Sequence, residues 1–291
     1  MRSWLFIPGD SERKLAKLDA LESDAVILDL EDAVLPEAKT VARKRVREAL
    51  DARPTPRAAP VWVRINPLDG PLALADLAAV VGGRPDGIML PKFRTVADLQ
   101  RLDAALAALE AREGLAENSI PMVAVGTETA RSLFELGTLD AAGPRLQGLT
   151  WGAEDLAVDL GAARNRDSKG EWLPTYQLAR SLVLAGAAAA GIQAIDTVYT
   201  DFRDREGLRE SCRRARADGF AGKLAIHPDQ VSVINEAFTP GDDEVEWARA
   251  VIAVFAEGSG DGALSLHGKL LDAPHLKQAQ RILAQAAQSA R

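Results

Sequence analysis

Two acidic residues, Glu128 and Asp155, have the types and the spacing of a divalent metal site. Glu128 follows the apolar run "MVAVGT", and Asp155 follows "LTWGAE". They stand about one strand-and-helix unit apart, which places them on neighbouring strands that lie about 4.8 Å from each other. Oxygen ligands without cysteine or a nearby histidine favour Mg2+, or Mn2+, over zinc. We therefore predict that both carboxylates bind one such cation, whose open positions take water and substrate.

Glu154 directly precedes Asp155, but the two acids should have different roles. Successive strand residues point to opposite faces, so Glu154 should not share the direction of Asp155. A carboxylate in the first turn of a helix is stabilised by the helix dipole. We assign Glu154 to such a turn, where it contributes mainly its backbone N–H.

Three further polar residues end apolar runs. Arg64, in "VWVRINP", offers a guanidinium that suits a substrate carboxylate or a carbonyl that becomes an enolate. A salt bridge to Glu31 or Asp32 is the structural alternative for Arg64, and both roles can hold at once. Lys92, which ends "MLPK", could form a Schiff base in a metal-free aldolase, although the carboxylate pair disfavours that role. We interpret His227, in "AIHP", as a hydrogen-bonded residue at the floor of the pocket.

The elements that must position these residues are short apolar runs, which alternate with longer helical patterns. Nearly continuous apolar runs are typical of parallel strands that are covered on both faces. Eight such units over about 240 residues predict a (β/α)8 TIM barrel, with its chemistry at the carboxyl ends of the strands. A doubly wound sheet is the alternative, but no GxGxxG follows the first run and no GxxxxGK[ST] occurs. The runs are "SWLFIP", "AVILDL", "VWVRIN", "GIMLPK", "MVAVGTE", "LQGLTWG", "IDTVYT" and "KLAIHP".

We divide the chain into a barrel domain at 1–240 and a C-terminal helical extension at 241–291. In the extension, "TPGDDEVEWARAVIAVFAEG" predicts a closing helix and "SGDG" a flexible joint. "LLDAPHLKQAQRILAQAAQ" predicts a terminal helix entered through Asp272. Such an extension can act as a lid, reach a neighbouring subunit as an arm, or pack on its own barrel.

The amino-acid composition limits which classes of binding partner and which cellular location are expected. The 42 acidic and 35 basic residues give a net charge of −7, and no stretch joins Lys and Arg to aromatics, so nucleic acid is not an expected partner. No charge-free apolar run approaches membrane-spanning length, and "MRSWLFIPGD" is too short in apolar residues for a signal peptide. Cys212, the only cysteine, excludes an intrachain disulfide. We predict a cytoplasmic protein without a membrane partner.

The runs and their polar ends resemble the citrate lyase β-subunit family within the HpcH/HpaI aldolase superfamily. The blocks match in order as "RSWLFIPGD", "DAVILDLEDAV", "VWVRINP", "GIMLPK", "GTETARSL", "LTWGAEDLAVDLG" and "GKLAIHPDQV". The resemblance implies a Mg2+-dependent lyase that cleaves a citramalyl-, malyl- or citryl-CoA type thioester into a keto acid and an acyl thioester. In that family pattern, Glu128 and Asp155 match the metal ligands and Arg64 the substrate arginine. The backbone N–H groups of Gly152, Ala153 and Glu154 would bind the carboxylate of a keto acid such as oxaloacetate or pyruvate.

The C-terminal segment resembles that of malyl-CoA and citramalyl-CoA lyases, whose "DAP"-like motif carries an acidic residue into an adjacent subunit. Asp272 holds that position here, which implies a proton-transfer role for Asp272 and a homo-oligomer, a trimer or hexamer. The hydroxy-keto-acid aldolases of the superfamily have a histidine base after the second strand, where this chain has Asp32. We count Asp32 with Arg64 and Asp272 as the candidate catalytic residues.

Several alternatives stay open. The thioester carrier can be CoA or an acyl carrier protein, and the β-subunit resemblance leaves citrate lyase α and γ subunits as further partners. Two other functions fit the same residues. One is a metal-dependent aldolase that acts on free keto acids, and the other is an oxaloacetate-, pyruvate- or CoA-binding protein with little turnover.

Overall fold

The computed structural model describes residues 1–53, 55–257 and 264–289. It divides into two compact units, Met1–Ile234 and Asn235–Arg291, and the helix α8 (Val231–Phe238) spans the division. The predicted boundary at 240/241 falls just before the next helix. Each unit is described by itself.

The first unit is a closed barrel of eight parallel strands in the order β1 to β8. This confirms the predicted TIM barrel, and each strand contains at least part of one predicted apolar run. The predicted run "IDTVYT" leaves the sheet early, because the chain stops pairing after Asp196 and Thr197 begins a loop. The strands are β1 (Ser3–Pro8), β2 (Ala25–Asp29), β3 (Val61–Arg64), β4 (Gly87–Leu90), β5 (Met122–Gly126), β6 (Leu146–Trp151), β7 (Gln193–Asp196) and β8 (Gly222–Ala225).

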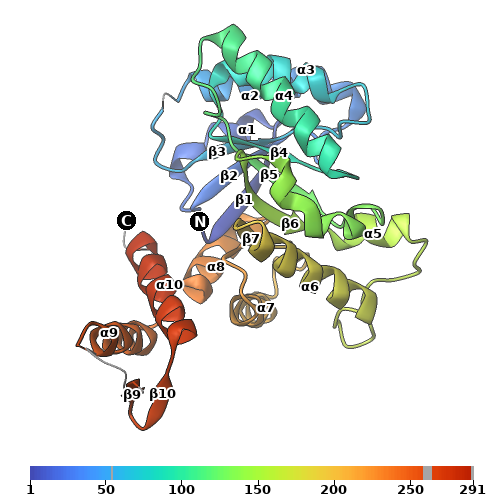
Figure 1. The fold of residues 1–291 in the computed structure, drawn as a ribbon. Helices are drawn as coiled ribbons and strands as arrows, with labels where there is room; N and C mark the ends of the chain where they lie inside the picture. Colours follow the sequence, from blue (N-terminus) through green and yellow to red (C-terminus); the bar gives the residue numbers. More distant parts are fainter. Residues whose placement is uncertain (54, 258–263, 290–291) are drawn as a thin grey trace. The chain divides into compact units, whose positions relative to one another are not determined.

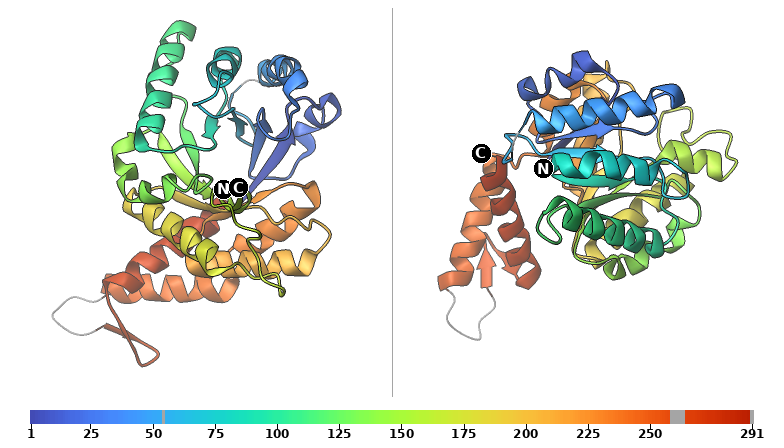
Figure 2. Two further views of the ribbon diagram at one scale, coloured as in Figure 1. Left: turned by 90° about the vertical axis from the view of Figure 1, so that its right-hand side faces the viewer. Right: turned by 90° about the horizontal axis from the view of Figure 1, so that it is seen from above.

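Helices surround the strands, as the two views of Figure 2 show. Between β5 and β6 the described chain forms only 3-10 turns, Ser132–Phe134 and Leu136–Ala142. The helices are α1 (Glu12–Leu15), α2 (Lys39–Asp51), α3 (Ala73–Val80), α4 (Val96–Glu113), α5 (Ala153–Asp159), α6 (Pro174–Ala189) and α7 (Arg205–Asp218). Three of them, α2, α3 and α4, pack side by side along one side of the barrel (Figure 1).

In helix α4, individual residues determine where the helix begins, which side is buried and where it ends. It begins after Thr95, and the Thr95 N–H donates to the Asp98 carboxylate at 3.1 Å. Its apolar side is buried at Val96, Leu99, Leu102 and Leu106. It ends at Gly114, whose φ of +64° is the left-handed conformation that glycine adopts without strain.

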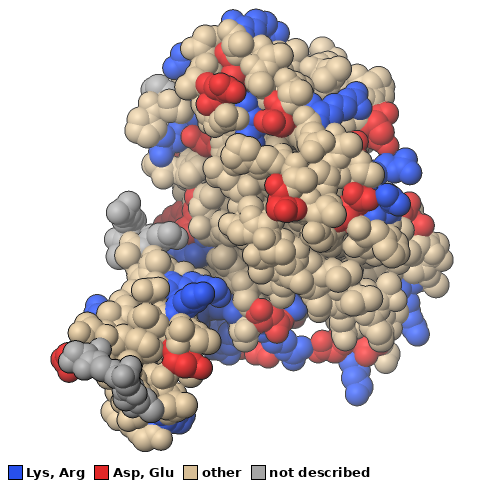
Figure 3. All heavy atoms as spheres, in the orientation of Figure 1, with Lys and Arg blue, Asp and Glu red and all other residues tan. Residues whose placement is uncertain are grey.

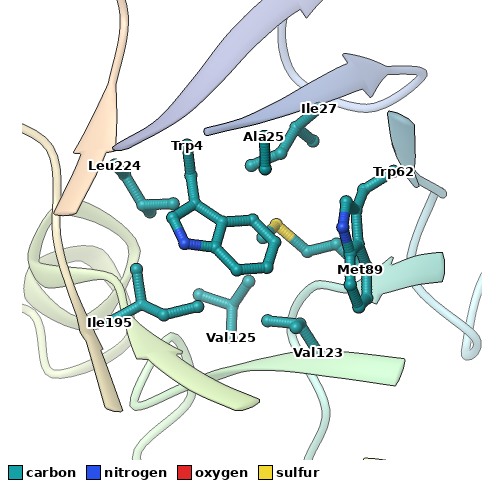
Figure 4. Packing of buried hydrophobic residues seen from close by; sticks show 9 residues of the cluster. All are labelled: Trp4, Ala25, Ile27, Trp62, Met89, Val123, Val125, Ile195 and Leu224. Atoms are coloured by element: carbon teal, nitrogen blue, oxygen red, sulfur yellow. The ribbon is translucent and has the colours of Figure 1, made fainter. Parts of the chain in front are cut away.

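The barrel interior is apolar up to the level of the strand ends. In Figure 4, side chains from most of the strands converge around the Trp4 indole, and the rings of Trp4 and Trp62 lie 5.1 Å apart. The Trp62 ring leaves no room for a side chain at Gly87, where a Cβ atom would lie 2.1 Å from it. The half-buried Phe6 and Val198 pack against this cluster.

The second unit is a helix pair with a short hairpin. It contains α9 (Asp242–Glu257), β9 (Leu264–Leu266), β10 (Lys269–Leu271) and α10 (Ala273–Ser289), and β9 pairs with β10 in antiparallel fashion. Helices α9 and α10 pack through Ala248, Val251, Ala279 and Ile282. Both predicted helices are present, and α10 begins directly after Asp272. The hairpin was not predicted, and the predicted "SGDG" joint lies outside the described residues.

Charges of both signs are interspersed on the face that Figure 3 shows. Across the described ranges of the chain, no helix combines the length and the apolar character that crossing a membrane requires.

Candidate active site

A cavity of about 410 Å3 opens at the carboxyl ends of the barrel strands. It brings together seven of the site residues that were predicted within the barrel. Those residues are Asp32, Arg64, Glu128, Gly152, Ala153, Glu154 and Asp155. Strand order explains this convergence, because the carboxyl ends of parallel barrel strands meet on one face.

Glu128 is the most buried acid of the predicted set, with 6% of its surface exposed. Its Oε2 accepts the backbone N–H of Lys92 at 2.6 Å. Its stem lies against Gly152, where a Cβ atom would come within 2.6 Å of the Glu128 Cγ. Burial, followed by the nearby carboxylates of Glu31 and Asp155, raises the pKa of Glu128 to about 8.

The backbone on both sides of this contact is strained. Lys92 has a φ of +52° and Thr127, the residue before Glu128, a φ of +73°. A positive φ is uncommon outside glycine and is a genuine outlier for a β-branched residue such as Thr127. Strain of this kind persists only where surrounding contacts fix it, and here the buried Thr127 N–H donates to Ser132 Oγ at 3.1 Å. Both strained residues act on the Glu128 carboxylate, since Lys92 donates its N–H to it and Thr127 directly precedes Glu128 in the chain.

Asp155 lies in the first turn of α5, with 37% of its side chain exposed. Its Oδ1 is 3.2 Å from the ammonium nitrogen of Lys92. Lys92 therefore touches both predicted metal ligands, Glu128 through its backbone N–H and Asp155 through its side chain.

The Lys92 ammonium also contacts Glu31 at 2.7 Å and Asp32 at 3.2 Å. Burial lowers the pKa of Lys92, but the Glu31, Asp155 and Asp32 carboxylates outweigh burial and raise that pKa above its usual value. A firmly protonated ammonium is a poor nucleophile, so this geometry argues against Lys92 as a Schiff-base residue.

Arg64 ends β3 and is clamped by two acids of the neighbouring strand region. Its Nε and Nη2 donate to the two Asp29 oxygens at 2.7 and 2.6 Å, and its Nη1 lies 2.7 Å from Glu31. Bidentate pairing of this type fixes the plane of the guanidinium. The salt bridge to Glu31 was one of the two predicted alternatives, whereas the contact with Asp29, which lies inside the apolar run "AVILDL", was not predicted. The signal was present, because a charge inside such a run needs a partner.

Glu31 itself is held by a buried lysine behind the site. The Lys39 ammonium donates to the carbonyls of Leu30 and Glu31, both at 2.7 Å, and to Asn66 Oδ1 at 2.9 Å. Three acceptors satisfy the three N–H groups of an ammonium, so Lys39 locks the turn after β2. This turn positions the Glu31 carboxylate for its ion pair with Arg64.

The local charge balance fits a divalent cation. The ion pairs near Glu128 join more carboxylates than cations, since two cations, Arg64 and Lys92, meet several acids. The acids are Asp29, Glu31, Asp32, Glu128 and Asp155. Among the described residues, no three His, Cys, Asp or Glu side chains are grouped so that they could hold a metal ion by themselves. The donor set therefore suits Mg2+, which commonly takes one or two carboxylates and keeps its other positions for water and substrate.

The "GAED" turn places Glu154 at the start of α5, as the strand and helix pattern predicted. Glu154 lies exposed in the first turn of α5, and its carboxylate accepts from Asn165 Nδ2 at 2.8 Å. The Gly152 N–H is directed to Thr127 Oγ1 at 3.3 Å and to Gly126 O at 3.4 Å. Ala153 and Glu154 are the first two residues of the helix, whose N–H groups have no acceptor within the helix.

His227 is not among the residues that line the cavity, and Asp272 belongs to the second unit. His227 caps a 3-10 turn by accepting the Asp229 N–H at 3.2 Å, stacks on Phe202, and has 40% of its side chain exposed. It is structural, as expected, but not at the pocket floor. Asp272 lies in the second unit directly before α10, where its carboxylate contacts His275 Nδ1. Its catalytic role stays a prediction.

A TIM barrel whose strand-end cavity is lined by carboxylates and an ion-paired arginine has the features of a metal-dependent barrel enzyme. Comparison with known proteins identifies the family. Residues 2–228 match the family model of HpcH/HpaI aldolase/citrate lyase. The chain is 36% identical to mitochondrial citramalyl-CoA lyase of Mus musculus, an alignment covering 97% of this chain and 85% of that protein. It is 37% identical to (3S)-malyl-CoA thioesterase of Cereibacter sphaeroides, over 98% and 94% of the two chains.

Among solved structures, CitE of Mycobacterium tuberculosis in complex with magnesium, acetoacetate and coenzyme A has a TM-score of 0.81. It is 34% identical to this chain, with 98% of each chain covered. The chain therefore belongs to the HpcH/HpaI aldolase/citrate lyase family. This confirms the resemblance seen in the sequence and the enzyme class expected from it, a lyase.

Proposed function

We propose that this protein is a Mg2+-dependent lyase that cleaves a hydroxyacyl-CoA thioester into a keto acid and an acyl-CoA by retro-Claisen chemistry. The observation that carries the proposal is the pairing of the buried Glu128 with Asp155 in a cavity where acids outnumber cations. The citramalyl-CoA lyase relative and the CitE complex with magnesium and coenzyme A support the same chemistry.

Each residue has a chemical task in this proposal. Glu128 and Asp155 would hold Mg2+, which when bound supplies Lewis acidity worth several kcal/mol. The N–H groups of Ala153 and Glu154 would orient the carboxylate of the acid portion. Arg64 would donate to the thioester oxygen as it gains enolate charge, a contribution of about 3 kcal/mol if it matches one oxyanion donor.

The protons must also be accounted for. Asp32, exposed at the cavity and 3.2 Å from the Lys92 ammonium, is the candidate to accept the substrate hydroxyl proton. The carbon–carbon bond then breaks, and its electron pair goes to the thioester enolate. Asp272 would deliver a proton to the enolate carbon.

A thioester panel tests the proposal. Citramalyl-, malyl- and citryl-CoA are incubated with the protein and Mg2+, and the release of keto acid is followed. We expect turnover that Asp155→Ala abolishes together with Mg2+ binding. Full activity and unchanged Mg2+ affinity in Asp155→Ala would refute the metal assignment. Repeating the panel with Mn2+ tests whether that ion replaces Mg2+.

A hydrolase is the second candidate, because one relative is named a malyl-CoA thioesterase. The products separate the two reactions. Lyase cleavage gives a keto acid and leaves the thioester intact, whereas hydrolysis gives a hydroxy acid and a free CoA thiol. Measuring keto acid and free thiol in the same sample decides between them.

Other expectations from the sequence remain proposals with their own tests. Cleavage of free hydroxy acids beside their CoA esters tests the aldolase alternative. Tight keto-acid binding without any product would favour a binding protein. We also infer a homo-oligomer, to be measured by analytical ultracentrifugation. A cytoplasmic location is supported by the single, buried Cys212 and is checked by cell fractionation.

A further inference from the structure

A buried ion pair joins β7 to β8 next to residues that line the cavity. Asp196 and Lys223 are partners in the register of these strands, and the Lys223 ammonium donates to Asp196 Oδ2 at 2.6 Å. Asp196 is 3% exposed and Lys223 is 1% exposed. The residues that follow them in the chain, Thr197 and Leu224, line the cavity. The pair has no task in the proposed lyase chemistry, so its presence needs another explanation.

Stability alone does not explain the pair. Moving two charges out of water costs free energy, and replacing a buried ion pair by apolar residues of similar volume is often neutral or stabilising. An ion pair offers what apolar side chains cannot, a fixed hydrogen-bond acceptor. Burial raises the pKa of Asp196, but Lys223 and Arg180 outweigh burial and hold that pKa below its usual value. The carboxylate therefore stays ionised and can accept hydrogen bonds.

The Asp196 carboxylate holds the indole of Trp151. The Trp151 Nε1–H donates to Asp196 Oδ1 at 2.8 Å, and the Arg180 Nε donates to the same oxygen at 3.3 Å. Together with Lys223 on the other oxygen, these donors fix the orientation of the carboxylate. Trp151 is 1% exposed, so its N–H would lose free energy if it had no acceptor. The hydrogen bond therefore favours one orientation of the Trp151 ring.

Trp151 connects this hydrogen bond to the cavity. It lines the cavity and directly precedes the "GAED" turn, which carries Asp155. On its other side, the Trp172 ring packs edge-on against it with ring centroids 5.1 Å apart. The next residue, Gly152, has no room to move, because a Cβ atom there would lie 2.6 Å from the Glu128 Cγ. A displaced Trp151 would therefore shift the turn against Glu128.

We propose that Asp196 is a positioning residue of the active site, which acts through the indole N–H of Trp151 to place the "GAED" turn against Glu128. Lys223 holds the Asp196 carboxylate in the orientation that this requires. The inference rests on the proposed function, because it assumes that Glu128, Asp155 and the turn bind the metal and the keto-acid carboxylate.

Two neutral double variants separate the hydrogen bond from the charge. In the amide variant, Asp196→Asn with Lys223→Gln, the two amides can pair and the new amide oxygen at position 196 can still accept the indole N–H. The apolar variant, Asp196→Leu with Lys223→Met, has side chains of similar size but no acceptor. Mn2+ affinity is measured by electron paramagnetic resonance and pyruvate affinity of the Mn2+-loaded protein by calorimetry. Neither measurement requires turnover.

The two variants should behave differently under conditions in which circular dichroism shows both to be folded. The amide variant should bind Mn2+ and pyruvate within about threefold of wild type. The apolar variant should bind both at least about tenfold more weakly, as when a residue that orients a metal ligand is lost. Wild-type affinity in the apolar variant would overturn the proposal. So would an equal loss in both variants, because the charge and not the acceptor would then matter.

Trp151→Phe tests the same hydrogen bond from its donor and keeps the proposal testable if a double variant does not fold. It removes the N–H and keeps an aromatic ring. Alone, it should weaken Mn2+ and pyruvate binding at least about tenfold. Added to the apolar variant, it should weaken them by less than about threefold more, because the bond is already absent. Unchanged binding in Trp151→Phe, or losses that multiply in the combination, would overturn the proposal.

The same measurements separate this inference from the lyase proposal. If no thioester is cleaved but the binding losses follow the expected order, the lyase function fails and the positioning role stands. If thioesters are cleaved but every variant binds Mn2+ and pyruvate as wild type does, the positioning role fails alone. A wild-type protein that binds neither Mn2+ nor pyruvate would overturn both.

Discussion

The raised pKa of Glu128 predicts that stability of the metal-free protein falls as pH rises. The ordinary pKa of a glutamate is 4.5, and in the folded protein that of Glu128 is about 8. Between these values the folded state keeps a proton that the unfolded chain has released, so the free energy of unfolding decreases with pH. At about 1.4 kcal/mol per pH unit, the full effect is roughly 5 kcal/mol, complete above pH 8.

Mg2+ should reverse this loss. The ion binds the ionised carboxylate, so its binding releases the Glu128 proton below pH 8 and its affinity rises with pH in that range. The stabilisation conferred by Mg2+ should therefore be small at pH 6 and largest near pH 9, where metal-free Glu128 is charged and buried.

Urea unfolding from pH 5.5 to 9, with EDTA or with saturating Mg2+, measures both effects. The matched control is Glu128→Gln, which keeps the shape and the acceptor for the Lys92 N–H but has no proton to lose. Its metal-free stability should change several kcal/mol less than wild type over this range, and Mg2+ should add little. Equal slopes in the two proteins would refute the assignment of a raised pKa to Glu128.

Four further variants test the roles assigned to individual residues. Thr127→Gly removes left-handed strain but also the hydroxyl that accepts the Gly152 N–H, so the free energy of unfolding should change by no more than about 1 kcal/mol while Mn2+ binding, measured by electron paramagnetic resonance, weakens. Lys92→Met removes the ammonium from three carboxylates but keeps its N–H, and should cost about 1–3 kcal/mol in urea unfolding. Arg64→Lys cannot reproduce the two-point contact with Asp29 and should lower kcat/KM at least about 100-fold with an unchanged circular dichroism spectrum. Asp272→Asn should slow the exchange of acyl-CoA α-hydrogens with D2O by about 100-fold or more, followed by NMR, whereas unchanged exchange would exclude Asp272 as the proton donor.

The barrel was predictable because its signal is local. Each strand is buried on both faces, so an apolar run such as "AVILDL" marks it without knowledge of its neighbours. The polar ends of the runs then marked the cavity, including Glu128 and Asp155. These inferences need only the order of strands and the rule that strand ends converge.

What the sequence did not reveal depends on contacts between distant residues. Asp29 belongs to β2 and Arg64 to β3, and only the register that pairs them shows which acid the guanidinium meets. Trp151 of β6 and Asp196 of β7 are far apart in the sequence, so their hydrogen bond could not be predicted either. The left-handed backbone at Thr127 is imposed by its surroundings, since a β-branched residue disfavours that conformation.

Lys92 shows both what the local sequence pattern predicts and what only contacts between distant residues reveal. The sequence showed a lysine at a strand end, which suggested a nucleophile, but tertiary contacts give it a different task. Its strained backbone directs an N–H at Glu128, while its ammonium neutralises Asp155 and two other acids. Without such a cation the acids at this mouth, including the two proposed metal ligands, would repel one another. We therefore infer that Lys92 preorganises the site through its positive charge and does not act as a nucleophile.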